Sequence, residues 1–230
     1  MDATAVHGSA APARQGTSLP IVLVCAVGAE RRHLAPLAAP GVEILASGIG
    51  AAAARRRGEQ VVERGAAALF SVGFCGALVP DLAVGDLIAA DTVVDEATGG
   101  AFPCDPGLLG AAPGRRGTLV SAARLVRTPA ERARLTGLAC DMESAALADV
   151  AAGAGIPFLA LRAVTDAAHH VLPDFDRLTD AAGQLTPGWG LVHFLLHPRD
   201  LGRLARLGPA SRRAGRALAE GVEHTLRALA

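Results

Sequence analysis

Short, wholly apolar runs alternate along the chain with segments whose apolar residues recur at helical spacing. The apolar runs predict buried strands, and the periodic segments predict helices. The expected strands are 21–27, 42–47, 67–72, 84–94, 119–121 and 158–164, and the expected helices are 30–38, 51–64 and 144–154. This alternation predicts an α/β fold of three layers, in which a mixed, mainly parallel sheet is flanked by helices.

Three other segments have compositions of their own. Asp95–Arg116 is rich in glycine, proline and small residues, which predicts a mobile loop over a site. Residues 1–19 are expected to be a flexible tail, and residues 20–230 a single domain. The arginine-rich end, His197–Ala230, has leucines at helical spacing and predicts basic amphipathic helices. These helices would pack on the domain or, alternatively, touch a membrane surface.

Composition narrows the possible chemistry. The chain has 230 residues, of which 51% are hydrophobic and 19% charged, and its net charge is zero. This balance gives no case for a nucleic-acid partner. The four cysteines lack metal-ligand spacing, so we expect reduced thiols, no metal and a cytoplasmic protein. Lysine, asparagine and tyrosine are absent, which excludes Schiff-base chemistry and a phosphate-loop lysine.

Two acidic clusters mark the ends of one helix–strand unit. Asp141 and Glu143 begin the expected helix, and Thr165 and Asp166 follow the expected strand. Open α/β sheets bind ligands at the carboxyl ends of their strands. Acids at the start of a helix are commonly caps, but two clusters at one sheet edge favour a site that binds a sugar and protonates a leaving group.

Two glycine-containing turns offer further sites. Gly48–Ala53 fits the GxGxxA pattern of dinucleotide-binding proteins, but Ala68–Phe70 stand where the ribose-binding acid is expected, which argues against an oxidoreductase. Gly28–Arg32 follows the first strand and could present amide donors and a guanidinium to phosphate. The alternative for this second turn is a solvated helix start.

Five short motifs together resemble the nucleoside phosphorylase and methylthioadenosine nucleosidase superfamily. They are Ser47–Gly50, Val72–Leu78, Val84–Asp91, Asp141–Ala146 and Arg162–Asp166. The resemblance covers about 21–166. More narrowly, the arginine-rich end resembles the hopanoid-associated phosphorylases that remove adenine from adenosylhopane. The resemblance therefore implies a purine nucleoside phosphorylase-like fold and phosphorolysis of adenosylhopane in hopanoid biosynthesis.

The resemblance also implies roles for individual residues. Glu143 would hold the ribose hydroxyls with Met142 against the sugar, and Asp166 would protonate the purine. Gly28, Arg32 and Ser47 would bind inorganic phosphate, a co-substrate, with no other cofactor. The further substrate-binding candidates are Asp141, Phe74 and Thr165. The family also implies a homo-oligomer, here cytoplasmic or peripheral to the inner membrane face.

Some positions depart from the family pattern. Phe74 stands where a serine or threonine is usual, and Ser71 where hexameric phosphorylases have a second phosphate-binding arginine. Leu125 replaces a phenylalanine that stacks on adenine in nucleosidases. These departures leave two alternatives open. One is a nucleosidase that cleaves without phosphate, with Glu30 activating water, and the other is a nucleoside-binding protein of weak activity.

Overall fold

The protein is an α/β structure built on eight strands. The computed structural model describes residues 19–172 and 198–230, with side chains from residue 208 onward in the second segment. The strands are β1 (Ile21–Cys25), β2 (Val42–Ala46), β3 (Ala68–Ala77), β4 (Leu87–Asp95), β5 (Ala101–Pro103), β6 (Arg115–Ser121), β7 (Ala139–Asp141) and β8 (Phe158–Asp166). The helices are α1 (Gly28–Leu34), the 3-10 turn η1 (Ala35–Leu37), α2 (Ala51–Arg64), α3 (Pro106–Ala111), α4 (Pro129–Arg132), α5 (Ser144–Ala154) and α7 (Pro198–Leu229).

The sheet is mixed and partly closed. Its strand order is β2-β1-β3-β7-β6-β4-β5, and β8 pairs with both β3 and β4, so that β3, β7, β6, β4 and β8 form a ring. Five of the eight pairings are parallel. Because β1, β2, β3 and β8 run in parallel, their carboxyl ends meet at one edge, as the site prediction requires.

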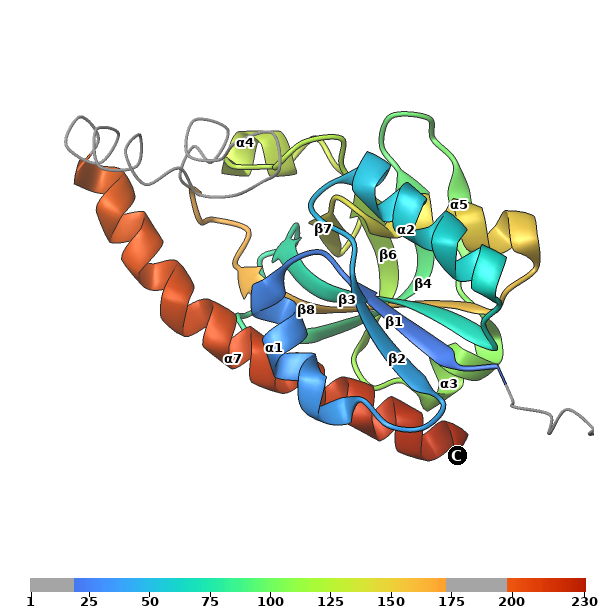
Figure 1. The fold of residues 1–230 in the computed structure, drawn as a ribbon. Helices are drawn as coiled ribbons and strands as arrows, with labels where there is room; N and C mark the ends of the chain where they lie inside the picture. Colours follow the sequence, from blue (N-terminus) through green and yellow to red (C-terminus); the bar gives the residue numbers. More distant parts are fainter. Residues whose placement is uncertain (1–18, 173–197) are drawn as a thin grey trace, which may run out of the picture.

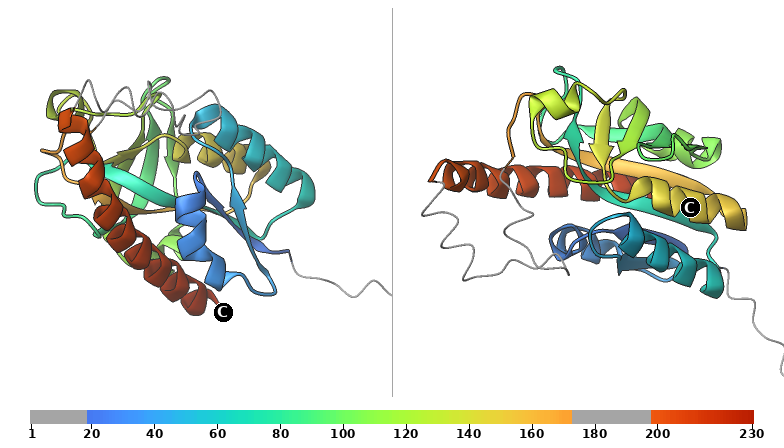
Figure 2. Two further views of the ribbon diagram at one scale, coloured as in Figure 1. Left: turned by 60° about the vertical axis from the view of Figure 1, so that its left-hand side comes forward. Right: turned by 90° about the horizontal axis from the view of Figure 1, so that it is seen from above.

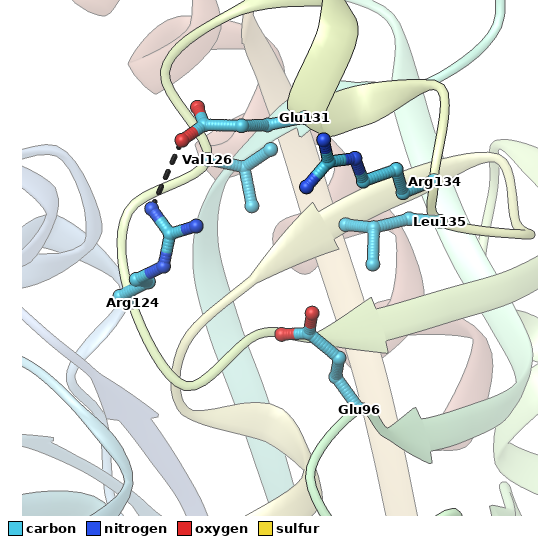
Figure 3. Close-up of a pocket in the computed structure, with 6 residues that line it drawn as sticks. All are labelled: Glu96, Arg124, Val126, Glu131, Arg134 and Leu135. Carbon is cyan, nitrogen blue, oxygen red and sulfur yellow. Dashed lines mark hydrogen bonds and ion pairs between the residues drawn. The ribbon is translucent and has the colours of Figure 1, made fainter.

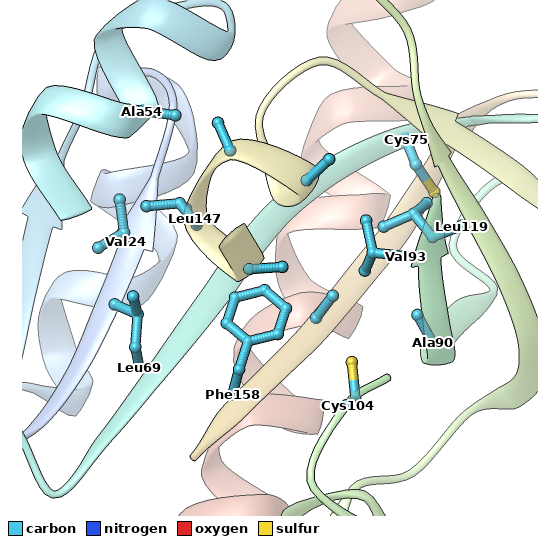
Figure 4. Packing of buried hydrophobic residues seen from close by; sticks show 14 of the residues in the cluster. Val24, Ala54, Leu69, Cys75, Ala90, Val93, Cys104, Leu119, Leu147 and Phe158 are labelled. Atoms are coloured by element: carbon cyan, nitrogen blue, oxygen red, sulfur yellow. The ribbon is translucent and has the colours of Figure 1, made fainter. Parts of the chain in front are cut away.

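Helices cover the sheet on both sides. Helices α2 and α5 pack together on one side, and α1, α3 and α7 lie on the other (Figures 1 and 2). Figure 4 shows the core beneath α2 and α5, where Ala54 and Leu147 meet Val24, Leu69 and Phe158. Small side chains let the two helices approach, since a Cβ atom at Gly58 would lie 3.2 Å from Val150 Cγ1. This tight layer fixes the start of α5, where Glu143 lies.

The opposite core is completed by the end of the chain. Leu34 of α1, Leu108 of α3 and Leu218 of α7 are buried in one apolar cluster with strand residues. Gly215 of α7 lies against the ring of His33, where a Cβ atom would be 2.6 Å from His33 Cγ. Among the helices described, none has the length and hydrophobicity needed to cross a bilayer.

The sequence-based elements agree with the structure in outline. The mixed, mainly parallel sheet flanked by helices is confirmed, as are the bounds of α2 and α5. Glycines in the positive-φ region, Gly65 and Gly155, terminate these two helices. Strands β3, β4 and β6 are longer than or shifted from the expected runs, and β7 and α4 were not expected. The end of the chain forms one long helix where several were expected.

The prediction of a mobile loop at 95–116 is wrong. This segment contains β5 and α3, and Asp105 caps α3 by accepting the backbone N–H of Leu108 at 2.9 Å. Cys104 and Leu108 are buried in the two cores. The amide of Asp105 donates to the carbonyl of Phe158, at the opposite end of β8 from Asp166. Glycine and proline here build a short strand, a cap and a turn, and the segment does not cover the site.

Candidate active site

Asp166 ends β8 and is held from two sides. The pairing of β8 with β3 places it beside Gly76. The Thr165 hydroxyl lies 2.8 Å from Asp166 Oδ1, and Arg132 Nη2 forms an ion pair with Asp166 Oδ2. The Asp166 and Arg132 side chains are both buried. Thr165 and Asp166 are thus the last two residues of the strand, which was expected to end just before them.

Glu143 lies between β7 and α5 and reaches across to α2. Its Oε1 accepts the backbone N–H of Gly50 at 2.8 Å, at the start of α2. Free N–H groups at the start of a helix favour a carboxylate. The adjacent Met142 is half-buried and contributes to a cavity beside Asp166. The glycine pattern at 48–53 therefore serves, in this fold, to present an amide to Glu143.

Asp141 is fully engaged within the protein. Its Oδ1 accepts the hydroxyl of Ser121 at 2.5 Å, and its Oδ2 accepts the Ser144 backbone N–H at 3.0 Å. Its Oδ2 also pairs with Arg162 Nη2 at 2.6 Å, and its side chain has no exposed surface. The structure therefore gives Asp141 a supporting position next to Glu143.

Glu30 turns from α1 into the same region. Its Oε2 accepts the backbone N–H groups of Ala26 at 2.8 Å and Val27 at 3.0 Å. Its Oε1 accepts the N–H of Phe74 at 2.8 Å. The side chain thus joins the end of β1 to β3, and only 3% of the residue is exposed. Backbone amides grouped in this way can bind phosphate, but here they donate to the carboxylate of Glu30.

Arg162 is a buried cation at the centre of these acids. Its Nη2 is 2.6 Å from the Ser71 hydroxyl and 2.8 Å from that of Ser144, in addition to its ion pair with Asp141. Its Nη1 is buried and has no hydrogen-bond partner among the described residues. A Cβ atom at Gly73 would collide with this Nη1 and lie 2.6 Å from Glu30 Oε1. Glycine at 73 therefore allows both groups to pack closely against β3.

Burial sets the ionisation of the acids. It raises the pKa of Glu143 to about 7, an effect that the charge of Asp141 increases and Arg162 opposes. Burial also raises the pKa of Glu30, against the charge of Arg162 and its backbone hydrogen bonds. Burial alone would lower the pKa of Arg162, but Asp141, Glu143 and Glu30 outweigh it and raise that pKa. Glu143 is thus able to take up a proton near neutral pH.

A small cavity of about 50 Å³ lies beside Asp166. Aliphatic side chains of Leu125, Val126, Met142 and Leu172 contribute to its lining, together with Gly76. The Leu172 backbone N–H donates to the carbonyl of Arg127 at 2.9 Å, which fixes the segment after β8 over the cavity. Leu125 and Leu172 thus lie on segments that border this cavity.

The phosphate-binding candidates are dispersed. Arg32 is exposed on α1, without a described contact to the acidic residues, and Gly28 is exposed at the start of that helix. Ser47 lies next to the end of β1, where its hydroxyl is 2.8 Å from the Gly48 carbonyl and 3.3 Å from that of Cys25. Phe74 is half-buried on β3 and contributes its amide to Glu30. Ser47 and Gly28 lie at one edge of the sheet, and Arg32 lies one helical turn after Gly28 on α1.

Metal and thiol chemistry find no support in these residues. The described part of the chain contains no group of three or more histidine, cysteine or acidic side chains placed to hold a metal. All four cysteines are buried, and burial raises the pKa of Cys25 and Cys140 to about 12. A buried thiol of this kind is a weak nucleophile.

A second hollow, of about 80 Å³, opens next to α4 (Figure 3). It contains two arginines and two glutamates, and Arg124 pairs with Glu131 at 2.9 Å. Glu131 also accepts hydrogen bonds from the backbone N–H groups of Arg127 and Thr128. The hydrogen bond from Arg124, together with these two, lowers the pKa of Glu131 to about 2. Because two glutamates balance the two arginines, this hollow has no excess positive charge to attract an anion. The hydrogen bonds of Glu131 hold α4 in place.

Two buried arginines that pair with the acidic residues were not predicted. Arg162 interrupts the otherwise apolar run 158–164, and a charge in a buried strand is a signal that a buried partner exists. Arg132 is one of several arginines in a polar segment, and nothing in the sequence distinguishes it. Its place beside Asp166 follows only from how α4 packs.

Comparisons with known proteins agree with this fold. The family model described as "Phosphorylase superfamily" matches residues 31–186. No curated protein matches the sequence. Among solved structures, S-adenosylhomocysteine nucleosidase from Streptococcus pyogenes has a TM-score of 0.70 at 20% identity, covering 95% of this chain and 100% of its own. Futalosine hydrolase of Helicobacter pylori has a TM-score of 0.69 at 14% identity, covering 91% and 97%.

Proposed function

The chain belongs to the phosphorylase superfamily, and we propose that it cleaves the N-glycosidic bond of a purine nucleoside by hydrolysis. The observation that carries this proposal is the position of Glu30. Its carboxylate accepts three backbone amides at the end of β1 and on β3, and only a glycine at position 73 lets it lie this close to β3. We infer that this carboxylate, whose pKa burial raises, is the base that activates water.

The other residues have roles that follow from their positions. Water attacks the anomeric carbon and gives its proton to Glu30, while the bond to the base breaks and its electron pair leaves with the base. Asp166 takes up a proton from solvent before cleavage and donates it to the departing purine. Glu143 binds the ribose hydroxyls and stabilises the positive charge that develops on the sugar. Met142 packs on the sugar, and Thr165 orients Asp166 through the 2.8 Å contact of their side chains.

The structural relatives support hydrolysis over phosphorolysis. The solved structures reported above are, by name, a nucleosidase and a hydrolase. In this chain phosphate would have to displace Glu30 from the amides of Ala26, Val27 and Phe74. Arg32, the cation expected to bind phosphate, is exposed on α1.

Phosphorolysis of adenosylhopane is the second candidate. The sequence resemblance to hopanoid-associated phosphorylases favours it, and Gly28 and Ser47 lie at the sheet edge where phosphate would bind. Basic residues on α7, including Arg212, Arg213 and Arg216, are exposed and would suit a membrane-linked substrate. In this case inorganic phosphate replaces water as the nucleophile.

Adenine release with and without phosphate separates the two candidates. We expect release from adenosine and from a 5'-alkyl adenosine at a rate that phosphate does not change. The sugar products should be ribose and the 5-alkyl ribose, respectively. Glu30→Gln should lower this rate on the order of 10²-fold or more, because it removes the base. Glu63→Gln, an exposed glutamate of α2, is the matched control. Release that requires phosphate and yields a sugar 1-phosphate would overturn hydrolysis and support the second candidate.

A further inference from the structure

Arg132 is buried against Asp166 in a position that the reaction outlined above does not explain. The residue is 2% exposed, and its Nη2 pairs with Asp166 Oδ2. Its Nη1 donates to the carbonyl of Ala77 at 2.9 Å, and its Nη2 is 3.4 Å from the carbonyl of Val126. The guanidinium thus connects Asp166 to β3 and to the chain that lines the small cavity.

The surroundings are built to keep this ion pair. Arg132 is the last residue of α4, which Thr128 and Glu131 fix through a capping box. A Cβ atom at Gly76 would lie 2.9 Å from both Arg132 Nη1 and Asp166 Oδ2. Burying two charges is costly unless they are paired and hydrogen-bonded, so the pair specifies the position of both groups.

We propose that Arg132 is a positioning residue that fixes Asp166 and stabilises its carboxylate after the proton has moved to the base. This inference rests on the proposed function, in which Asp166 protonates the departing purine. Arg132 binds Oδ2 and Thr165 contacts Oδ1, so the carboxyl group has one orientation relative to the cavity. Asp166 and Gly76 line that cavity, whereas Arg132 does not.

The chemistry explains why a cation here accelerates cleavage. When Asp166 gives its proton to the purine nitrogen, a negative charge appears on Asp166 in a buried site. A preorganised guanidinium stabilises that charge as it forms, without reorganisation at the moment of reaction. A leaving group that departs as a stable anion needs no such proton, so its release depends little on Arg132.

Two substrates with different leaving groups test this role. Adenosine requires protonation of its base, whereas 4-nitrophenyl β-D-ribofuranoside releases a stable anion. For Arg132→Gln we expect the kcat for adenosine to fall on the order of 10²-fold, as general acid catalysis is worth 10²- to 10⁴-fold. The kcat for the nitrophenyl riboside should change less than about threefold, and Asp166→Asn should give the same pattern. Arg132→Lys should recover part of the adenosine rate.

Controls distinguish positioning from folding. Arg134→Gln changes an exposed arginine two residues away and should leave both rates unaltered. In Asp166→Asn, adding Arg132→Gln should cause no further loss, and this double variant also avoids a lone buried charge. An equal loss on both substrates, or none on either, would overturn the role of Arg132 while leaving hydrolysis in place. A wild-type protein that cleaves neither substrate would overturn the proposed function and this inference with it.

Discussion

At the scale of single residues, Glu143 lies in a buried environment that disfavours its negative charge, at the position where we propose that the ribose binds. Burial and the charge of Asp141 raise its pKa to about 7, although the amide of Gly50 stabilises the carboxylate. A carboxyl group whose pKa is higher in the folded state than in the unfolded chain stabilises the fold most when it is protonated. That contribution is complete below pH 4.5, the ordinary value, and is lost as the pH rises through 7.

Glu143→Gln should therefore improve stability and impair activity. A neutral amide removes the cost of the buried charge. As the pH rises from 4 to 8, the unfolding free energy of the variant should therefore increase by roughly 3 kcal/mol relative to that of wild type. The rate of base release should fall on the order of 10²-fold, because stabilisation of the charged sugar is lost. Urea denaturation at both pH values and an adenine-release assay measure the two effects. Exposed Glu63→Gln is the control, and an unchanged pH dependence in Glu143→Gln would contradict the assignment.

The site residues divide by the kind of signal that they leave in the sequence. The positions of Glu143 and Asp166 at this sheet edge were predictable, because Glu143 directly precedes a clear helix and Asp166 ends a clear strand. Glu30 was considered only as an alternative, since its orientation depends on amides from two strands. Arg162 left a weak signal and Arg132 none, because their side-chain partners are 18 or more residues away along the chain.

At the scale of elements, predictability follows length and periodicity. Helices α2 and α5 have three or more turns and end at glycines, so their bounds could be read from the sequence. Strand β7 and helix α4 have three and four residues, too few to show a period. The segment 95–116 was misread because glycine and proline favour loops but also begin and end short elements.

The contact between α7 and α1 depends on one glycine. Gly215 packs on the His33 ring with no room for a methyl group. Gly215→Ala normally favours a helix, but here the added carbon must displace His33 or the whole of α7. We expect a net destabilisation of about 1–3 kcal/mol, the usual cost of overpacking. Thermal denaturation followed by circular dichroism measures it.

Arg216→Ala provides the comparison for this substitution. Arg216 is the next residue of α7 and is exposed, so its replacement should change the unfolding free energy by less than about 0.5 kcal/mol. Equal stability of the Gly215→Ala and Arg216→Ala proteins would show that α7 can move away from α1 without cost.

At the scale of the whole molecule, the sheet joins the two cores into one body. Neighbouring residues of β3 alternate between them, since Leu69 belongs to the core under α2 and α5, and Phe70 to the core under α7. The end of the chain is part of this arrangement, because Ala214, Leu218 and Val222 of α7 have no exposed surface. The apolar face of this half of α7 is therefore used in packing, and the arginines remain on the outside.

Because α7 shares a core with β8, loss of one contact in α7 should weaken the entire fold, including the site. Leu218→Ala leaves a cavity in the second core and should cost about 2–5 kcal/mol. We expect base release and helical circular dichroism to be lost in the same urea transition, shifted to lower concentration than in wild type. Hydrogen exchange should give similar protection to the amides of Leu218 in α7 and Leu161 in β8. If α7 instead loses protection well before the sheet, residues 208–230 form a separate unit, and the prediction of a single domain is wrong.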